Sequence, residues 1–302
     1  MKAVVLHEYG PAKNLKLEDF ADPTPARGEV LIRVHAAGVN PIDWKMRSGA
    51  AKDRFPVEFP AILGYDFAGI VQALGEDVTT FTVGDRVFGR TARTYAELTT
   101  AKASEIAKVP EGLDLTTAAA LPVIATTAHQ LIHEAVNAQP GQTILLTGAL
   151  GSVGRIAIFS ALELGAKVIA GVRKKQIDEA LSLGATAAID IADDDALATV
   201  GFVDAVADTI GGPLSAKLLA HIKPGGTYGG ITGPPQDADL NPTIQIKVFG
   251  SHPDPVAMLH YAEAIHSGKL KLPVDLILPL ADAAEAQAKG EKGGIGKIVL
   301  TA

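Results

Sequence analysis

Three glycines at three-residue spacing interrupt an apolar run in the segment "LLTGALGSVG", residues 145–154. Apolar residues then recur at helical spacing as far as Leu164, and Gly165 is placed to end the helix. A strand, a tight turn and a helix in this order present free backbone amides at the helix N-terminus, where a pyrophosphate binds. We therefore predict that this turn contacts a dinucleotide. The predicted contacts are Gly148, Gly151, Ser152, Val153 and Gly154.

A glycine-rich turn of another α/β protein, such as a methyl-transfer fold, is the alternative interpretation of this segment. The spacing is G-x-x-G-x-x-G, with Ala149 where the G-x-G-x-x-G pattern has a glycine, so the turn by itself is a weak signal. Its position between a predicted strand and a predicted helix is what favours dinucleotide binding.

The end of the next predicted strand, "VIAGVRKKQ" at residues 168–176, indicates which dinucleotide binds. An acidic side chain at this point would accept hydrogen bonds from the ribose of NAD, but the position holds Gly171. Arg173, Lys174 and Lys175 follow, and these cations can pair with the 2′-phosphate of NADPH. We therefore predict NADPH as the cofactor, bound by Arg173 and Lys174. A solvated basic helix start is the alternative, although cations are unfavourable at a helix N-terminus.

Length and composition narrow the class of protein. The chain of 302 residues is suited to two modest domains, and its 47% hydrophobic and 20% charged residues describe a globular α/β protein. The net charge of −7 carries no basic block, which argues against binding of nucleic acid or an anionic membrane and favours a small-molecule partner. The chain has no cysteine, which excludes disulfides, thiolate catalysis and zinc sites built on cysteine. The N-terminal segment has no readable signal peptide, and we expect a cytoplasmic protein.

The elements that position these residues change character along the chain. Short β-type runs separated by glycine and proline extend to about residue 120, and strands alternate with helices from about residue 122. We predict an α/β fold with a doubly wound parallel sheet and a β-rich first domain. The Ala-rich segment at 281–289 is interpreted as an ordinary surface helix. The strands predicted after residue 122 are Thr143–Thr147, Lys167–Gly171, Ala187–Asp190, Val203–Asp208, Gly226–Ile231 and Ile244–Phe249, with two more in "PVDLILPL" (273–280) and "GKIVLTA" (296–302).

With these motifs in view, the chain resembles the medium-chain dehydrogenase/reductase superfamily, in its zinc-independent quinone oxidoreductase and alkenal reductase branch. The resemblance implies a GroES-like catalytic domain over 1–121, completed by about 272–302, a Rossmann NADPH-binding domain over 122–271, and an active site in the cleft between them. It also suggests a homodimer. The segments that carry the resemblance are "GVNPIDWKMRSG" (38–49), "PAILGYDFAGIVQALGEDVTTFTVGDRVFG" (60–89), "AAALPVIATTAHQLI" (118–132), the glycine turn and the terminal "GKIVL".

No metal site is expected. The resemblance places Asn40 and Tyr65 where zinc alcohol dehydrogenases of this superfamily have a Cys and a His ligand, and a tetrahedral zinc site cannot be assembled from these replacements. His129 and His133 form an i, i+4 pair that can share an ion on a helix, but a third ligand with clear spacing is missing.

Without a metal, hydride transfer suits an acceptor that delocalises its own negative charge. The sequence therefore predicts an oxidoreductase that passes hydride from NADPH to a quinone or an α,β-unsaturated carbonyl. Asn40, Lys45 and Tyr65 are the candidates to stabilise the developing oxygen anion. Each has a simpler interpretation: Asn40 caps a turn before Pro41, Lys45 is a solvated surface charge, and Tyr65 packs beneath Asp66. We interpret Asp43 as a structural hydrogen-bond acceptor, and Trp44 as either a pocket wall or a core residue.

Further cofactor contacts are expected along the same face. Thr127 resembles the superfamily threonine beside the nicotinamide, and Ile210, Ile231 and Thr232 follow predicted strands at the edge where open α/β sheets bind ligands. Two other functions remain open: a reductase of enoyl thioesters, and a sensor that binds NADPH without turnover. The sequence does not identify the physiological acceptor.

Overall fold

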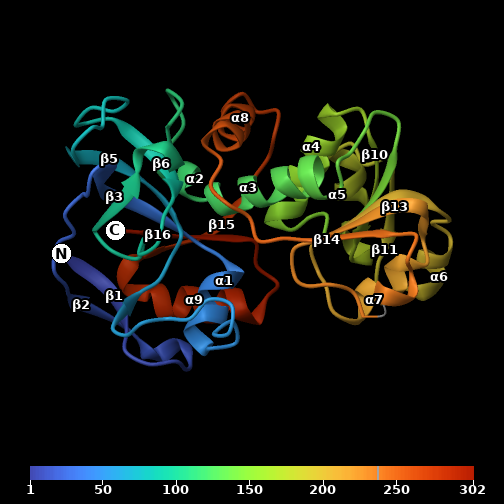
Figure 1. Cartoon of the computed structure of the whole chain (residues 1–302), viewed down its shortest axis with the longest axis horizontal. Helices are drawn as coiled ribbons and strands as arrows, with labels where there is room; N and C mark the ends of the chain where they lie inside the picture. The colour runs from blue at the N-terminus through green and yellow to red at the C-terminus, as the bar shows by residue number, and fades with distance from the viewer. Residues whose placement is uncertain (237) are drawn as a thin grey trace. The chain divides into compact units, whose positions relative to one another are not determined.

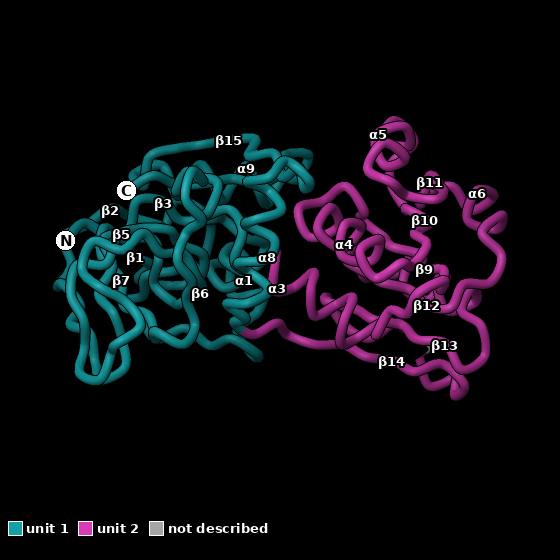
Figure 2. Tube along the Cα trace, turned by 90° about the horizontal axis from the view of Figure 1, so that it is seen from above, with its two compact units in different colours: residues 1–123, 253–302 teal, residues 124–252 magenta. Residues whose placement is uncertain are grey.

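Residues 1–236 and 238–302 are described in a computed structural model (Figure 1). They divide into two units, each described by itself below: unit 1 comprises residues 1–123 and 253–302, and unit 2 comprises residues 124–252 (Figure 2). The domain boundaries predicted from the sequence, at 121/122 and about 271/272, stay a prediction. The units divide at 123/124 and 252/253.

Unit 1 is the β-rich unit. Its larger sheet has the strand order β15-β16-β3-β5-β6-β8, with β7 also paired to β3, and its smaller sheet has the order β2-β1-β4. Its strands are β1 (Lys2–Leu6), β2 (Leu15–Asp19), β3 (Glu29–Val39), β4 (Ala61–Ile62), β5 (Asp66–Leu74), β6 (Arg86–Arg90), β7 (Leu98–Lys102), β8 (Ile106–Lys108), β15 (Val274–Pro279) and β16 (Lys297–Thr301). Its helices are α1 (Pro41–Ser48), α2 (Leu115–Ala119), α8 (Pro255–His266) and α9 (Ala283–Lys292), with 3-10 turns at Ala12–Asn14, Ala103–Glu105 and Leu280–Asp282.

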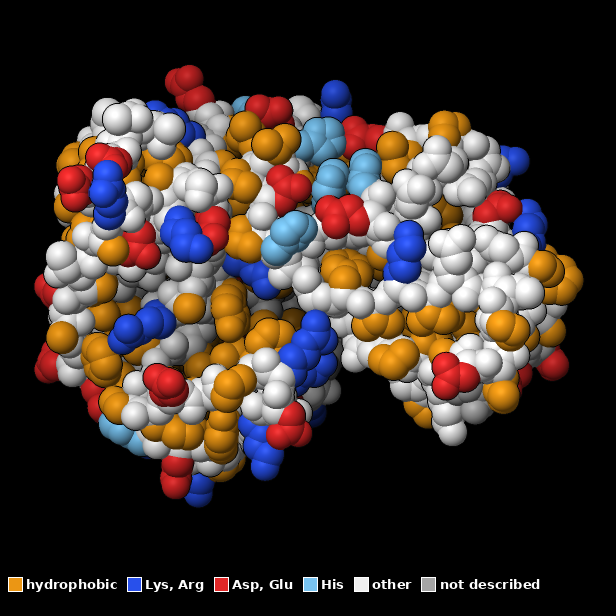
Figure 3. Space-filling model, viewed as in Figure 1, with side chains coloured by type: hydrophobic (Ala, Val, Ile, Leu, Met, Phe, Trp, Pro, Cys, Tyr) orange, Lys and Arg blue, Asp and Glu red, His pale blue; other side chains and the backbone are white. Residues whose placement is uncertain are grey.

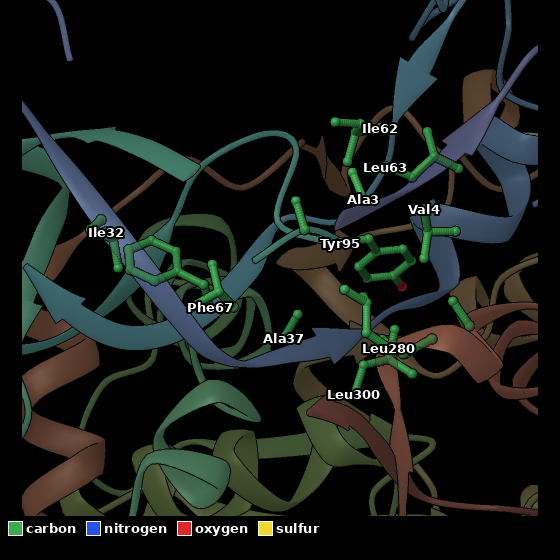
Figure 4. Packing of buried hydrophobic residues seen from close by; sticks show 14 of the residues in the cluster. Ala3, Val4, Ile32, Ala37, Ile62, Leu63, Phe67, Tyr95, Leu280 and Leu300 are labelled. Carbon is green, nitrogen blue, oxygen red and sulfur yellow. The ribbon is translucent and has the colours of Figure 1, made fainter. Parts of the chain in front are cut away.

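The C-terminal residues complete the first half of the chain, as the sequence predicts. Strand β16 runs antiparallel to β3, with Ile298 opposite Val39. Its apolar side chains join the core cluster in which Tyr95 and Phe67 are fully buried (Figure 4). The last strand therefore brings the side chain at its start, Lys297, into the interior of unit 1.

The interpretation of the Ala-rich segment as an ordinary surface helix is wrong. Helix α9 buries Ala283 and Ala286 completely in the core of unit 1, and Gln287 beside them is also fully buried. Alanine side chains let a helix approach a sheet closely, so an Ala-rich face is as suited to packing as to exposure. The Glu285–Lys289 ion pair lies on the exposed face of this helix.

Unit 2 contains the predicted parallel sheet. Its strand order is β11-β10-β9-β12-β13-β14, with parallel pairing throughout (Figure 2). The strands are β9 (Thr143–Thr147), β10 (Lys167–Val172), β11 (Ala187–Asp190), β12 (Val203–Asp208), β13 (Ile222–Gly230) and β14 (Gln245–Val248). The helices are α3 (Pro122–Gln130), which begins in unit 1 and continues as a π-helical turn at Leu131–Ala135, then α4 (Ser152–Glu163), α5 (Ile177–Ser182), α6 (Asp194–Ala198) and α7 (Pro213–Leu219), with 3-10 turns at Lys174–Gln176 and Ala238–Leu240.

The fold class predicted from the sequence is therefore confirmed. The chain fills this sheet outward from β9 in one direction and from β12 in the other, so the order reverses between these two neighbours. In open α/β sheets the carboxyl ends of the strands at such a reversal form the ligand-binding edge. Strands β9 and β12 end at Thr147 and Asp208, and these residues mark that edge of unit 2.

The surface carries mixed charge. On the face drawn in Figure 3, basic and acidic side chains are interspersed, in keeping with the absence of a basic block from the sequence. None of the helices over residues 1–236 and 238–302 combines the length and apolar content that a membrane span requires.

Candidate functional site

The glycine turn between β9 and α4 is built on close backbone approaches. Gly148 has a φ of +59°, and a Cβ atom there would lie 2.4 Å from Thr209 Oγ1. A Cβ on Gly154 would lie 2.2 Å from the backbone oxygen of Gly148, closer than any side chain can be placed. These two glycines are therefore required by the packing of the turn itself.

Helix α4 opens directly from this turn. Gly151 is its N-cap residue, and Ser152 and Val153 in its first turn are half-buried. The first amides of a helix have no partner within the helix and carry the positive end of its dipole. The predicted pyrophosphate contacts thus lie together at the ligand-binding edge of the sheet.

A buried carboxylate at the end of β12 was not among the predicted site residues. Asp208 is fully buried. Its Oδ1 accepts hydrogen bonds from Thr147 Oγ1 at 2.5 Å and from the amides of Ile210 and Gly211 at 2.9 and 3.1 Å. Its Oδ2 accepts from the hydroxyls of Ser215 at 2.7 Å and Tyr228 at 2.6 Å.

These donors decide the charge of Asp208. Burial opposes ionisation, but the hydroxyls of Thr147, Tyr228 and Ser215 outweigh it, so the pKa of Asp208 is lowered. Burial, together with the negative neighbour, raises the pKa of Tyr228. The carboxylate is thus ionised and the tyrosine neutral, as a donor to it.

The turn after β12 lies against the glycine turn, and the turn after β13 lies against the turn after β12. Ile210 keeps 48% of its side-chain surface exposed, and its Cγ1 would be 3.4 Å from a Cβ on Gly148. The Oγ1 of Thr232 lies 2.0 Å from the position a Cβ on Gly211 would take. The amide of Ile231 donates to the backbone oxygen of Asp208 at 3.2 Å. Of the predicted residues, Ile210 therefore lies beside Gly148, whereas Ile231 and Thr232 contact the end of β12 and the turn that follows it.

The end of β10 carries the predicted cationic residues. A Cβ on Gly171 would lie 2.9 Å from Ile191 Cδ1, so a larger side chain is poorly accommodated there. Arg173, Lys174 and Lys175 are all exposed. Over residues 1–236 and 238–302, none of these three cations forms an ion pair.

Helix α3 contributes Thr127 to unit 2. The Thr127 hydroxyl lies 2.9 Å from the hydroxyl of Ser251, which follows β14. Gln130, one turn later, holds His252 through two hydrogen bonds with its backbone, of 3.0 and 3.1 Å. Ser251 and Gln130 are thus further site candidates that the sequence reading missed.

The first of the predicted catalytic residues in unit 1 is held in a buried polar cluster. Asn40 is only 1% exposed; its Nδ2 donates to Asp66 Oδ2 at 2.8 Å, and its Oδ1 accepts from Lys297 Nζ at 2.8 Å. Lys297 Nζ also pairs with Asp66 Oδ2 at 3.0 Å, and Asp66 Oδ1 accepts from the amide of Val123 at 2.7 Å. Asn40 also precedes helix α1 as its N-cap, the simpler role considered for it.

Asp43 forms the second part of this cluster. Its Oδ2 accepts from the Asn40 backbone amide and from the Tyr95 hydroxyl, both at 2.8 Å, and among the described residues its Oδ1 has no hydrogen-bond partner. Burial raises the pKa of Asp43 to about 7, although the hydrogen bonds from Asn40 and Tyr95 act to lower that pKa. The two hydrogen bonds that its Oδ2 accepts confirm the expected role of Asp43 as an acceptor.

Tyr65 and Lys45 lie nearer the surface. Tyr65 is half-buried, its hydroxyl contacts Met46 Sδ at 3.5 Å, and the guanidinium carbon of Arg90 lies 5.9 Å from its ring centre. Burial and the nearby Asp43 raise the pKa of Tyr65, so its hydroxyl is protonated at neutral pH. Lys45 is exposed on α1. The assignment of Asn40, Lys45 and Tyr65 to contacts with an acceptor stays a prediction.

The donor chemistry of unit 1 does not fit zinc. At the two positions that the resemblance assigns to ligands, Asn40 is saturated by Asp66 and by the Lys297 ammonium, and Tyr65 offers a neutral phenol. Within the ranges that the structure describes, no group of three or more His, Asp or Glu side chains is arranged to hold an ion. His129 and His133 stack with ring centres 4.0 Å apart, and His133 Nε2 lies 2.9 Å from Ser160 Oγ.

Two family descriptions match parts of the chain. Residues 26–111 match the alcohol dehydrogenase GroES-like domain, which confirms the predicted GroES-like fold there, and residues 183–300 match the family described as zinc-binding dehydrogenase.

Individual proteins are similar over different shares of their length. Human quinone oxidoreductase is 37% identical over 172 residues, which is 56% of this chain and only 52% of that protein, so the chain spans about half the length of this relative. A 2-haloacrylate reductase from Burkholderia sp is 30% identical over 99% of this chain and 98% of its own.

Solved structures agree over the whole length. The quinone oxidoreductase from Coxiella burnetii superposes with a TM-score of 0.90 at 30% identity, covering 100% of this chain and 99% of that one. A mycobacterial protein complexed with NADPH gives a TM-score of 0.85 at 30% identity, with both chains fully covered.

The glycine turn generates a stability prediction. Gly154→Ala places a methyl group against the Gly148 carbonyl, so we expect it to lower the free energy of unfolding by about 2 kcal/mol. Gly151→Ala is the matched control, because Gly151 has a φ of −68° and its Cβ would lie 3.2 Å from the backbone oxygen of Gly148, farther than the 2.2 Å of the Cβ in Gly154→Ala. Urea unfolding followed by circular dichroism compares them; equal losses would contradict the packing argument.

Asp43 generates a pH prediction. With its pKa raised to about 7 in the folded state against 3.8 ordinarily, the unfolded chain loses this proton first as the pH rises. The contribution of Asp43 to the free energy of unfolding is therefore fully present below about pH 4, and it falls by roughly 1.4 kcal/mol per pH unit up to about pH 7. Asp43→Asn should remove this slope.

Trp44 on α1 is the only tryptophan of the sequence, so its fluorescence in the full chain reports the unfolding of unit 1, where Asp43 lies. Urea unfolding by its fluorescence at pH 5 and pH 7.5 should show a smaller difference for Asp43→Asn than for the wild type. Asp53→Asn, at an exposed carboxylate, is the control and should keep the wild-type difference. If Asp43→Asn keeps the wild-type dependence of the free energy of unfolding on pH, that dependence belongs to another titratable group.

Proposed function

Because the chain belongs to the medium-chain dehydrogenase/reductase superfamily, in its quinone oxidoreductase branch, we propose that it is a zinc-independent oxidoreductase. The proposed reaction transfers hydride from NADPH to a quinone or an α,β-unsaturated carbonyl compound. One observation carries it: the amides at the start of α4 and the exposed cations after β10 stand at the carboxyl ends of neighbouring strands.

Unit 2 would hold the carrier. The glycine turn and the amides of Ser152 and Val153 suit its pyrophosphate, and Arg173 and Lys174 suit the 2′-phosphate. A carboxylate at the end of β10 would repel that phosphate and bind the ribose hydroxyls of NADH, but the position holds Gly171. A mycobacterial structural relative that is complexed with NADPH supports the same choice. When bound, the carrier supplies a hydride from its nicotinamide C4 and becomes NADP+.

Unit 1 would act on the oxygen of the acceptor. Hydride addition to the β-carbon of an enone moves the carbon–carbon π electrons toward the carbonyl, whose oxygen becomes an enolate. The Tyr65 hydroxyl, protonated and half-buried, can donate a hydrogen bond to that oxygen, and Lys45 can lend positive charge. One proton from Tyr65 or from water then completes the saturated product, so the net reaction consumes one NADPH and one proton. Asn40, inside the cluster, would position α1 for this step.

Among the residues that the structure describes, no donor set fits zinc, and this favours acceptors of this kind. An isolated carbonyl needs a Lewis acid or a strong acid to accept hydride, whereas a quinone or enone spreads the charge over its own π system. The names of the relatives point the same way, since a 2-haloacrylate is an α,β-unsaturated carboxylate. The expectations of a cytoplasmic location and of a homodimer stay predictions.

Oxidation of NADPH, followed by its absorbance with quinones, enones, 2-haloacrylates and enoyl thioesters, tests the function. We expect turnover with quinones or enones that is unchanged by a chelator and is accompanied by no stoichiometric zinc in the purified protein. Turnover only with enoyl thioesters would favour that alternative, and tight binding of NADPH without any turnover would favour a sensor. Zinc-dependent activity would refute the metal-free mechanism.

The cations after β10 generate a prediction on cofactor choice. Replacing both Arg173 and Lys174 with Ala should raise the KM for NADPH by about tenfold or more, because paired charges to the 2′-phosphate are lost. The KM for NADH, which lacks this phosphate, should change little. The double variant Lys269→Ala and Lys271→Ala removes two exposed charges from unit 1 and should change neither value. Equal effects on both carriers would contradict the 2′-phosphate contact.

A further inference from the structure

We propose that Asp208 is the positioning residue of the cofactor-binding edge: its buried carboxylate fixes the turn after β12 against the glycine turn after β9. The inference rests on the proposed function, because it requires that the carrier binds at the carboxyl edge of the sheet in unit 2. It adds a residue that touches none of the reacting atoms and yet sets the affinity for the carrier.

The two oxygens of Asp208 join segments that are distant in the chain. Oδ1 accepts hydrogen bonds from Thr147 at the end of β9 and from the amides of Ile210 and Gly211 in the turn after β12. Oδ2 accepts hydrogen bonds from Ser215 near the start of α7 and from Tyr228 in β13. Among the ion pairs of the described ranges none contains Asp208, so neutral donors alone balance its charge.

Thr147 completes the link between the two turns. Its hydroxyl donates to Asp208 and accepts from the amide of Thr209 at 3.0 Å, while its backbone oxygen accepts from the Thr209 hydroxyl at 2.8 Å. Thr209 in turn lies over Gly148, the first glycine of the turn, and Ile210 beside it is the exposed side chain of this edge. The position of Ile210 relative to the glycine turn therefore depends on the Thr147–Asp208 pair.

An asparagine is a poorer acceptor at this place. Its NH2 group would face either the turn amides, which cannot accept, or the hydroxyls of Ser215 and Tyr228, which would have to turn from donors to acceptors. In both cases the hydrogen bonds to a charged acceptor are lost. The same change removes a negative charge near the pyrophosphate site, which by electrostatics alone would tighten the binding of an anionic carrier. Positioning and charge thus predict opposite changes in affinity.

Asp204 provides a matched control in the same strand. It lies four residues earlier, toward the amino end of β12, and accepts from the Thr143 amide at 2.8 Å and from Lys223 Nζ at 2.6 Å. Like Asp208 it joins β12 to β9 and β13. Its distance from the carboxyl edge means that Asp204→Asn perturbs the same sheet without reaching the proposed cofactor contacts.

The test is an equilibrium titration of the full chain with NADPH and with NADH, at a temperature where each variant is folded. Asp208→Asn should raise the Kd for both carriers by a similar factor, about tenfold, since loss of one hydrogen bond to a charged group corresponds to that change. Asp204→Asn should leave both Kd values within about twofold of the wild type. Urea unfolding should show that both variants lose stability.

A second pair of variants keeps the test decisive if Asp208→Asn does not fold. Thr147→Val removes the bridging hydroxyl with little change of volume and should weaken binding, whereas Thr147→Ser retains the hydroxyl and should bind as the wild type does. Unchanged or tighter binding by Asp208→Asn, or by Thr147→Val, would overturn the inference, as would equal weakening by Asp204→Asn. A wild type that binds neither carrier would refute the proposed function, and the inference with it.

Discussion

A carboxylate that is buried at the end of a strand must be met by donors, and both units depend on this constraint. In unit 1, Asp66 at the start of β5 is neutralised by the Lys297 ammonium, which arrives from the far end of the chain, and by the amide of Asn40. In unit 2, Asp208 at the end of β12 is met by neutral hydroxyls and amides alone. Leaving either carboxylate without its donors would cost several kcal/mol, so each one fixes the segments that supply them.

The two buried carboxylates differ in the groups that balance their charge. In unit 1 the Lys297 ammonium pairs with Asp66 and donates to the Asn40 side-chain oxygen, so the side chain of Asn40 is already engaged, and the neighbouring Tyr65 is half-buried. The neutral donors of unit 2 hold a negative charge in place without bringing a cation to it. Three cations of that unit, Arg173, Lys174 and Lys175, follow β10 and are exposed, whereas Lys223 pairs with Asp204.

Local patterns predicted the elements well and the polar contacts poorly. The bounds of β9, β11 and β12 agree with the sequence reading, because a short apolar run between turn residues is a local signal. Strand β13 begins at Ile222 rather than Gly226, since pairing with β12 extends it through a segment rich in glycine. The strand, turn and helix around Gly148, Gly151 and Gly154 were predictable because these residues lie within ten positions of one another.

The polar clusters could not be read in this way, because their members are far apart in the chain. Thr147 and Asp208 are separated by 61 residues, and Asn40 and Lys297 by 257. The available signal was weak: an Asp that ends an apolar strand, and a Lys that opens one, are buried only if the fold supplies partners. Helix α9 shows the same limit, since its alanines do not reveal whether they face solvent or the core.

The most direct measurement of the central claim is the stoichiometry of carrier binding. Titration of the purified chain with NADPH in a calorimeter, with a chelator present throughout, should give one saturable site per chain and weaker binding of NADH. A chain that takes up no NADPH under these conditions, or that binds it only after zinc is added, would contradict the account.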